Sequence, residues 1–187
     1  MENTPNAHEE VDLQALRRCR QGETSAFAEI VERYQQGIYR LAFSWTRQRE
    51  SAEELAQETF LKAYRGLEKF RGESKFSTWL YQIAMNLCRD RWRVRLRRPE
   101  AAVELENWGR GVVSEPDLAF RQEQERLNSM LGRLLPIYRE ALALRYFSEL
   151  SYEEIAQLTG AGLSNVKMRV ARALEQLRKM MGERKEK

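Results

Sequence analysis

The sequence predicts an all-α protein of two small helical domains joined by a flexible linker, the second of which contains a helix-turn-helix. Apolar residues recur every three or four positions, most clearly from Phe27 to Trp45, and this spacing is typical of a helix with one buried face. No proline occurs between residues 6 and 98, and no stretch shows the sustained alternation of a strand. Hydrophobic residues make up 42% of the 187 residues, which is enough to build cores and argues against a disordered chain.

The composition describes a heavily charged chain and excludes several classes of protein. Charged residues make up 32% of the chain, yet 32 basic and 28 acidic side chains leave a net charge of only +4. No apolar run approaches the roughly 20 residues that cross a bilayer, and the polar start has no secretory signal, so we expect a cytoplasmic protein without membrane insertion. Cys19, Cys88 and the single His8 cannot form a zinc site, and no common enzyme motif occurs. We therefore expect no metal, no cofactor, no catalytic residue and two packed, reduced thiols.

The next predicted helix has an unusual outer face. Residues 51–54 read as a capping box, Ser-Ala-Glu-Glu, which predicts a helix from there to about Leu67. At 100° per residue, its inner face is apolar and its outer face mixes charged residues with one leucine. The outer residues are Glu54, Gln57, Glu58, Leu61 and Arg65. A leucine among charges indicates a protein interface, although single exposed leucines are also common.

A helix predicted from Phe76 to about Arg97 carries a candidate nucleic-acid surface. One sector opposite its apolar side contains an aromatic ring, two amides and two arginines: Trp79, Gln82, Asn86, Arg89 and Arg93. Such a set stacks on unpaired bases, hydrogen-bonds to their edges and neutralises phosphate, which favours single-stranded over duplex DNA. The alternatives are that Trp79 belongs to the core and that Asn86 is a solvated polar residue.

A polar loop precedes this helix. It consists of Phe70, Arg71, Gly72, Glu73, Ser74 and Lys75. Its glycine lets the chain curl beside the start of the helix, so the loop could wall a pocket for one flipped-out base.

The charge distribution and the helix-breaking residues divide the chain. Residues 1–98 carry 18 basic and 14 acidic side chains, residues 99–120 carry 1 and 5, and residues 121–187 carry 13 and 9. Apolar periodicity lapses in the acidic middle segment, which also contains two prolines and two glycines. We therefore expect a polar leader at 1–11, a first domain at 12–98, an acidic linker at 99–120 and a second domain at 121–187. Two basic domains favour a polyanionic partner.

The second domain contains a helix-turn-helix. A capping box begins at Ser151, Gly160 permits the turn, and Ser164 is placed to cap the second helix. The first turns of that helix, which enter the major groove in this motif, present a polar and basic surface. Its residues are Ser164, Asn165, Lys167, Met168, Arg169, Ala171 and Arg172. The alternative is a helical hairpin that packs against protein, but cap, turn, core and basic face together favour DNA.

These motifs together resemble the bacterial extracytoplasmic-function (ECF) sigma factors. Their promoter-melting domain is similar to residues 52–65 (AEELAQETFLKAYR), 70–74 (FRGES) and 76–86 (FSTWLYQIAMN). Their second DNA-binding domain is similar to residues 135–145, 150–156 (LSYEEIA) and 166–172 (VKMRVAR). The occurrence of both matches in this order identifies the family more specifically than either motif alone.

The resemblance implies a role for each surface. The outer face that includes Leu61 would dock on the β′ clamp helices of core RNA polymerase, and the second domain would meet the β flap. The loop at 70–75, with Asn86, would capture a flipped base of the minus-ten element. The helix-turn-helix would read the minus-35 element as duplex, and an anti-sigma factor is implied as a further partner. Two rival hypotheses remain: a helix-turn-helix regulator that acts without polymerase, and an adaptor that binds only protein.

Overall fold

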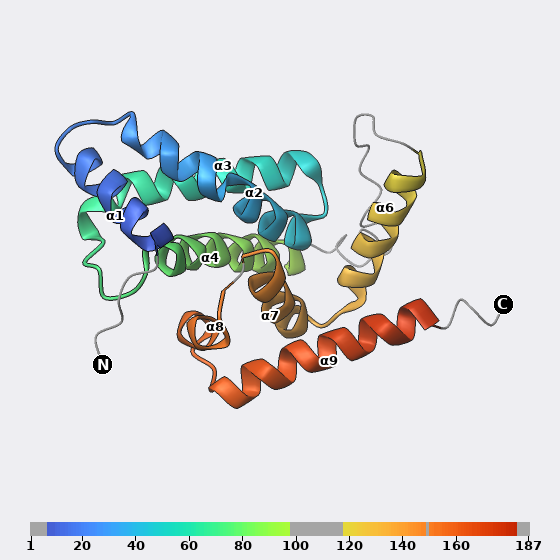
Figure 1. The fold of residues 1–187 in the computed structure, drawn as a ribbon. Helices are drawn as coiled ribbons and strands as arrows, with labels where there is room; N and C mark the ends of the chain where they lie inside the picture. The colour runs from blue at the N-terminus through green and yellow to red at the C-terminus, as the bar shows by residue number, and fades with distance from the viewer. Residues whose placement is uncertain (1–6, 98–117, 149, 183–187) are drawn as a thin grey trace.

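The computed structural model describes residues 7–97, 118–148 and 150–182, and within these ranges the chain forms helices and no strand. The elements in chain order are α1 (Ala7–Arg20), α2 (Ala26–Thr46), α3 (Arg49–Arg65), the 3-10 turn η1 (Leu67–Lys69), α4 (Phe76–Leu96), α6 (Leu118–Arg133), α7 (Pro136–Tyr146), α8 (Tyr152–Thr159) and α9 (Leu163–Gly182) (Figure 1). The predicted all-α fold class is confirmed. Most of the predicted linker lies outside the described residues. In the described part of the chain, no helix has the length and apolar composition that a membrane span requires.

The first domain is built around α2, which packs against α1, α3 and α4. Its core takes large side chains from three of these helices: Ile30, Ile38, Leu41, Leu55, Phe76 and Leu80. The apolar inner face of α3 is buried as its periodicity predicts. The candidate residues on the opposite faces of α3 and α4 therefore project from a packed helical body.

Helix α1 begins at Ala7, inside the segment expected to be a polar leader. Its Asp12 is only 2% exposed, forms an ion pair with Arg33 and accepts a hydrogen bond from the hydroxyl of Tyr34. A buried carboxylate needs such partners, because an unpaired one would bear the full cost of desolvation. These contacts fix α1 against α2.

The predicted capping box at Ser51 is wrong. Helix α3 begins at Arg49 after the extended Gln48, so Ser51 lies inside the first turn, where its hydroxyl donates to the side-chain oxygen of Gln48 at 3.2 Å. The reason lies in the preceding turn. Arg47 ends α2 in the left-handed conformation, with φ of +56°, and reverses the chain so sharply that α3 starts at once.

The helix-turn-helix forms as predicted. Ser151 and Glu154 form a complete capping box, with Glu154 N–H donating to Ser151 Oγ at 3.1 Å and Ser151 N–H donating to Glu154 Oε2 at 2.7 Å. Gly160 ends α8 with φ of +68°, a conformation that favours glycine. Helix α9 then begins at Leu163, one residue before the predicted cap, so Ser164 lies in its first turn.

We expect Ser151→Ala to lower the free energy of unfolding by about 1 kcal/mol, because it removes the acceptor for the Glu154 amide at a helix start. Urea denaturation followed by circular dichroism measures the change. Ser129→Ala is the control, since Ser129 is exposed within α6 and caps no helix. Equal stability of Ser151→Ala and the wild type would contradict the importance of the cap.

The two domains pack against each other, a feature that the sequence pattern does not reveal. Helix α7 lies against α2, and α8 lies against α4 (Figure 1). Apolar side chains of α7 and α8, including Leu144 and Ile155, join the core of the first domain. Arg139 of α7 is 3% exposed and stacks on Trp45 and Trp92, with 5.9 and 5.4 Å from its guanidinium carbon to the ring centroids.

Candidate nucleic-acid and protein interfaces

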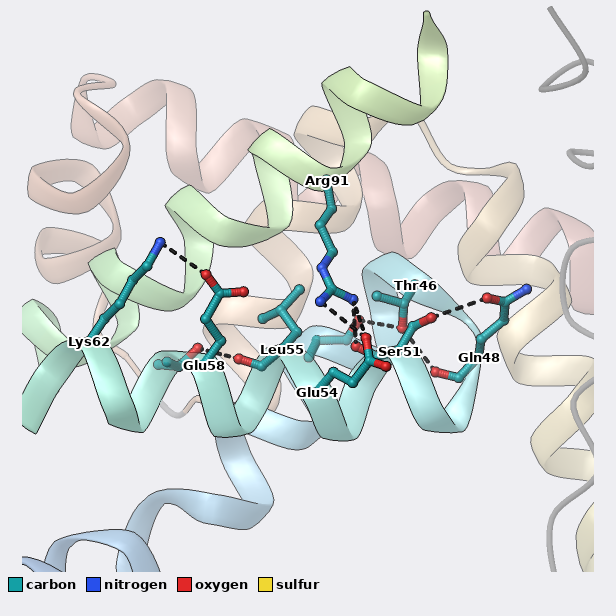
Figure 2. Close-up of polar contacts among 10 residues, drawn as sticks. Thr46, Gln48, Ser51, Glu54, Leu55, Glu58, Lys62 and Arg91 are labelled. Atoms are coloured by element: carbon teal, nitrogen blue, oxygen red, sulfur yellow. Dashed lines mark hydrogen bonds and ion pairs between the residues drawn. The ribbon is translucent and has the colours of Figure 1, made fainter. Parts of the chain in front are cut away.

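The outer face of α3 is exposed, as predicted. Leu61 is 56% exposed, Gln57 and Arg65 are exposed, and Glu58 is half-buried. The carboxylates on this face have basic neighbours. Glu58 pairs with Lys62 at 3.1 Å, and Arg91 reaches from α4 to Glu54 at 3.2 Å and to the carbonyl oxygen of Ser51 at 3.2 Å (Figure 2). Leu61 is thus an exposed apolar side chain on a face whose carboxylates are paired with basic groups, which suits a protein partner.

The polar face of α4 contains a row of hydrogen-bonded side chains one turn apart. The amide of Gln82 donates to Oδ1 of the exposed Asn86 at 3.2 Å, and Arg89 donates to the same oxygen at 3.5 Å. Arg93 continues the row and pairs with Asp90 at 3.2 Å. The predicted alignment of these residues is confirmed. Asn86 and Arg93 are exposed and Gln82 and Arg89 are half-buried. Their amide and guanidinium groups are of the kind that bonds to base edges and phosphates.

A pocket opens beside the start of α4. It is lined by Glu68, Lys69, Phe70, Arg71, Glu73, Ser74 and Trp79. Gly72 turns the loop with φ of +75°, and the side chains of Arg71 and Glu73 project into solvent 4.0 Å apart. Phe70, Arg71, Glu73 and Ser74 of the loop line this pocket, whereas Gly72 and Lys75 are not part of its lining. Glu68 and Lys69 were not predicted, because they lie in η1 and carry no motif of their own.

Trp79 lies between the core of the first domain and the pocket. Its half-buried ring packs on Phe70 and Phe76, with centroids 5.3 and 5.6 Å apart, and it also lines the pocket. Trp79 thus supports the pocket wall as part of an aromatic cluster.

The first turns of α9 display the predicted residues. Ser164, Asn165, Lys167, Met168, Ala171 and Arg172 are exposed, and Arg169 is half-buried. Arg169 donates to Oδ1 of Asn165 at 2.9 Å, and Arg172 lies 3.4 Å from the hydroxyl of Tyr138. Val166, Val170 and Ala173 are buried on the opposite side. This amphipathic helix presents a cationic surface that no other described helix covers.

Two ion pairs cross between the domains and involve the candidate DNA-binding cations. Arg89 of α4 pairs with the buried Glu140 of α7. Lys75 of the loop pairs with Glu154 of α8 at 3.1 Å. Sequence reasoning missed both pairs, since their partners are distant in the chain. Burial tends to raise the pKa of Glu154, but the bonds from Ser151 and Lys75 outweigh it and lower that pKa.

The two cysteines are packed thiols. Cys88 is 1% exposed and Cys19 is half-buried. Burial raises the pKa of both thiols, which keeps them in the unreactive protonated form.

Two family models match the chain. Residues 30–98 match the model of Sigma-70 region 2, and residues 124–177 match that of Sigma-70, region 4. The chain is 32% identical over 178 residues to the ECF RNA polymerase sigma factor SigW of Bacillus subtilis, covering 89% of this chain and 94% of that protein. It is 35% identical over 184 residues to the ECF RNA polymerase sigma-E factor of Haemophilus influenzae, covering 91% and 95% respectively.

The fold is also similar to solved structures. CnrH in complex with the cytosolic domain of CnrY matches with a TM-score of 0.72 and 26% identity, over 95% of this chain and 99% of CnrH. RpoE of Bartonella quintana, in complex with the anti-sigma factor NepR, matches the fold with a TM-score of 0.67 and 24% identity, over 83% of this chain and 96% of RpoE.

Proposed function

The chain belongs to the ECF family of RNA polymerase sigma factors, and from this premise we propose which of its surfaces binds each partner in transcription initiation. It is a transcription initiation factor. We propose that it supplies no catalytic group, that core polymerase performs the chemistry, and that it acts in the cytoplasm where polymerase is found. The observation that carries the assignment of surfaces is the continuous polar row on α4, which begins next to the loop pocket.

Core RNA polymerase would dock on the outer face of α3. Leu61 supplies an apolar contact, and Glu54, Gln57, Glu58 and Arg65 surround it with polar groups. This arrangement is typical of interfaces, which have an apolar centre and a polar rim. The β′ clamp helices are the expected partner, and the second domain is expected to meet the β flap.

The loop pocket and the polar row on α4 would bind the non-template strand of the minus-ten element. The pocket takes one flipped base, and Gln82, Asn86, Arg89 and Arg93 bind the strand that follows. Melting then needs no chemical step. The factor binds the open strand better than the closed duplex, and this difference in affinity offsets the few kcal/mol that unstacking a base costs.

The exposed turns of α9 would read the minus-35 element in the major groove. Asn165, Lys167 and Met168 are placed to reach base edges or phosphates, as the second helix of this motif does. Promoter DNA would thus be bound at two elements by two domains. An anti-sigma factor is a proposed further partner, and RpoE of Bartonella quintana, which is similar in fold, was solved in complex with the anti-sigma factor NepR.

Run-off transcription with purified core polymerase tests the proposal. A library of promoter fragments is transcribed with and without the full chain, and the transcripts are sequenced. We expect the chain to stimulate initiation from a subset of fragments that share two spaced elements. Absence of stimulation contradicts the proposal, and tight duplex binding without polymerase would favour the rival helix-turn-helix regulator.

We expect Lys167→Ala to remove one phosphate contact and so to weaken binding of the holoenzyme to a selected promoter roughly threefold. For the same reason, the slope of log affinity against log salt concentration should become shallower by about one. Filter binding at several salt concentrations measures both quantities. Lys179→Ala is the matched control, since Lys179 lies in the last turn of the same helix, beyond the recognition surface, and pairs with Glu175. Equal effects of the two substitutions would contradict the assignment of the first turns of α9.

A further inference from the structure

Arg20, the last residue of α1, reaches across to the segment that forms the pocket wall. Its guanidinium donates to the carbonyl oxygen of Leu67 at 2.9 Å and to that of Phe70. These two carbonyls bracket η1, and the amide of Phe70 also donates to Leu67 O at 3.2 Å. Arg20 therefore clamps both ends of the turn that carries Glu68 and Lys69.

The clamped turn is the part of the pocket that lies farthest from α4 in the chain. Glu68, Lys69 and Phe70 all line the pocket, and the Phe70 carbonyl belongs to the peptide that starts the loop. On the inner side, Leu67 and Phe70 are 5% and 6% exposed and pack into the core. Trp79 holds Phe70 from the α4 side, and Arg20 holds its backbone from the α1 side.

The base of the clamp is itself fixed. Arg18 bonds to Glu23 and to Glu29, with 2.7 Å between Nη1 and the Glu29 carboxylate, and this ties the end of α1 to the start of α2. Ala15 and Leu16 of α1 are buried in the core of the first domain. Both bonds leave the same nitrogen, Nη2, whose two N–H groups can each meet one carbonyl oxygen at the end of a long side chain.

We propose that Arg20 is a positioning residue for the base pocket, so that α1 contributes to minus-ten base discrimination without touching DNA. This inference rests on the proposed function of the pocket. Displacing a wall of a recognition site by about 1 Å is enough to cost selectivity, since the donors and acceptors of a base edge have fixed geometry. Loss of the clamp should therefore reduce discrimination among bases more than it reduces overall affinity.

The test uses holoenzyme made from core polymerase and the full chain. Forked promoter probes, randomised over the minus-ten element, are bound by the wild type and by Arg20→Ala, Arg20→Lys, Arg17→Ala and Asn86→Ala, and the bound probes are sequenced. Arg17→Ala is the matched control, because Arg17 is also exposed near the end of α1 and belongs to the same basic last turn. Core binding and the salt dependence of probe binding are measured for each variant.

We expect Arg20→Ala to lower enrichment of the preferred base at one or two positions by about tenfold. The affinity of Arg20→Ala for core polymerase and the salt dependence of its probe binding should equal those of Arg17→Ala. Arg20→Lys should recover discrimination only in part, because its ammonium has enough donors for both bonds but lies on a shorter side chain. A purely electrostatic role would instead be rescued fully by lysine, which keeps the positive charge.

Two outcomes would overturn the inference. One is unchanged base discrimination in Arg20→Ala. The other is a uniform loss of affinity for all probes with a smaller salt slope, which would show a direct phosphate contact. A failure of the proposed function itself would give another result. The wild type would then enrich no base in the minus-ten probes, and Asn86→Ala would show the same lack of enrichment.

Discussion

Leu61→Asp should reduce the affinity of the chain for core polymerase by about a hundredfold while leaving its fold intact. Leu61 is 56% exposed in the isolated chain, so a carboxylate there remains hydrated and costs little stability. At an interface the same carboxylate loses water without gaining a partner. Desolvating an unpaired charge at the centre of an interface costs about 2–4 kcal/mol, which corresponds to a factor of about 30 to 1000 in affinity.

Competition against a fluorescently labelled wild-type chain measures the change in polymerase affinity. Val94→Asp is the matched control, since Val94 of α4 is also 56% exposed but does not belong to the outer face of α3. Thermal melting of both variants checks that the helices remain folded. If Leu61→Asp and Val94→Asp weaken polymerase binding equally, the outer face of α3 is not the docking surface.

Local patterns predicted the surfaces well and the contacts between distant segments poorly. The periodicity of α3 and α4 placed Leu61 and Asn86 on outer faces correctly, because one helix face is buried whatever it packs against. The start of α3 could not be predicted, since it depends on the left-handed Arg47 that ends α2. Arg20 could not be linked to the loop, because the residues it bonds to are 47 and 50 positions away.

The packing of one domain on the other is the largest feature without a local signal. An arginine at position 139 and tryptophans at 45 and 92 look unrelated in the sequence, yet they stack at the domain contact. The contact also has a cost. Burial lowers the pKa of Arg139 to about 10, and burial together with the charge of Arg139 lowers that of Arg47 to about 10. The contacts of Arg139 with the two rings and with the carbonyl oxygens of Gly132 and Leu134 offset part of this desolvation cost.

Glu140→Gln should raise the affinity of the chain for minus-ten single strands by about tenfold. In the packed arrangement the Glu140 carboxylate holds Arg89, which cannot pair with a DNA phosphate at the same time. Only the fraction of molecules with the domains apart can bind, so apparent affinity rises with that fraction. Removing one half-buried ion pair that contributes about 1.4 kcal/mol raises this fraction about tenfold. Gly132→Ala should act in the same direction without changing a charge, because its Cβ would overlap the guanidinium of Arg47.

Small-angle X-ray scattering and fluorescence anisotropy with a labelled oligonucleotide measure the opening and the affinity together. Both variants should show a larger radius of gyration than the wild type and tighter binding. Glu153→Gln is the control. Glu153 is exposed on α8 and forms none of the cross-domain ion pairs described above, so this substitution removes the same charge without breaking one of them. If Glu140→Gln opened the chain without tighter binding, Arg89 would not be a strand contact. If it tightened binding without opening the chain, the gain would come from net charge alone, and Glu153→Gln would show it too.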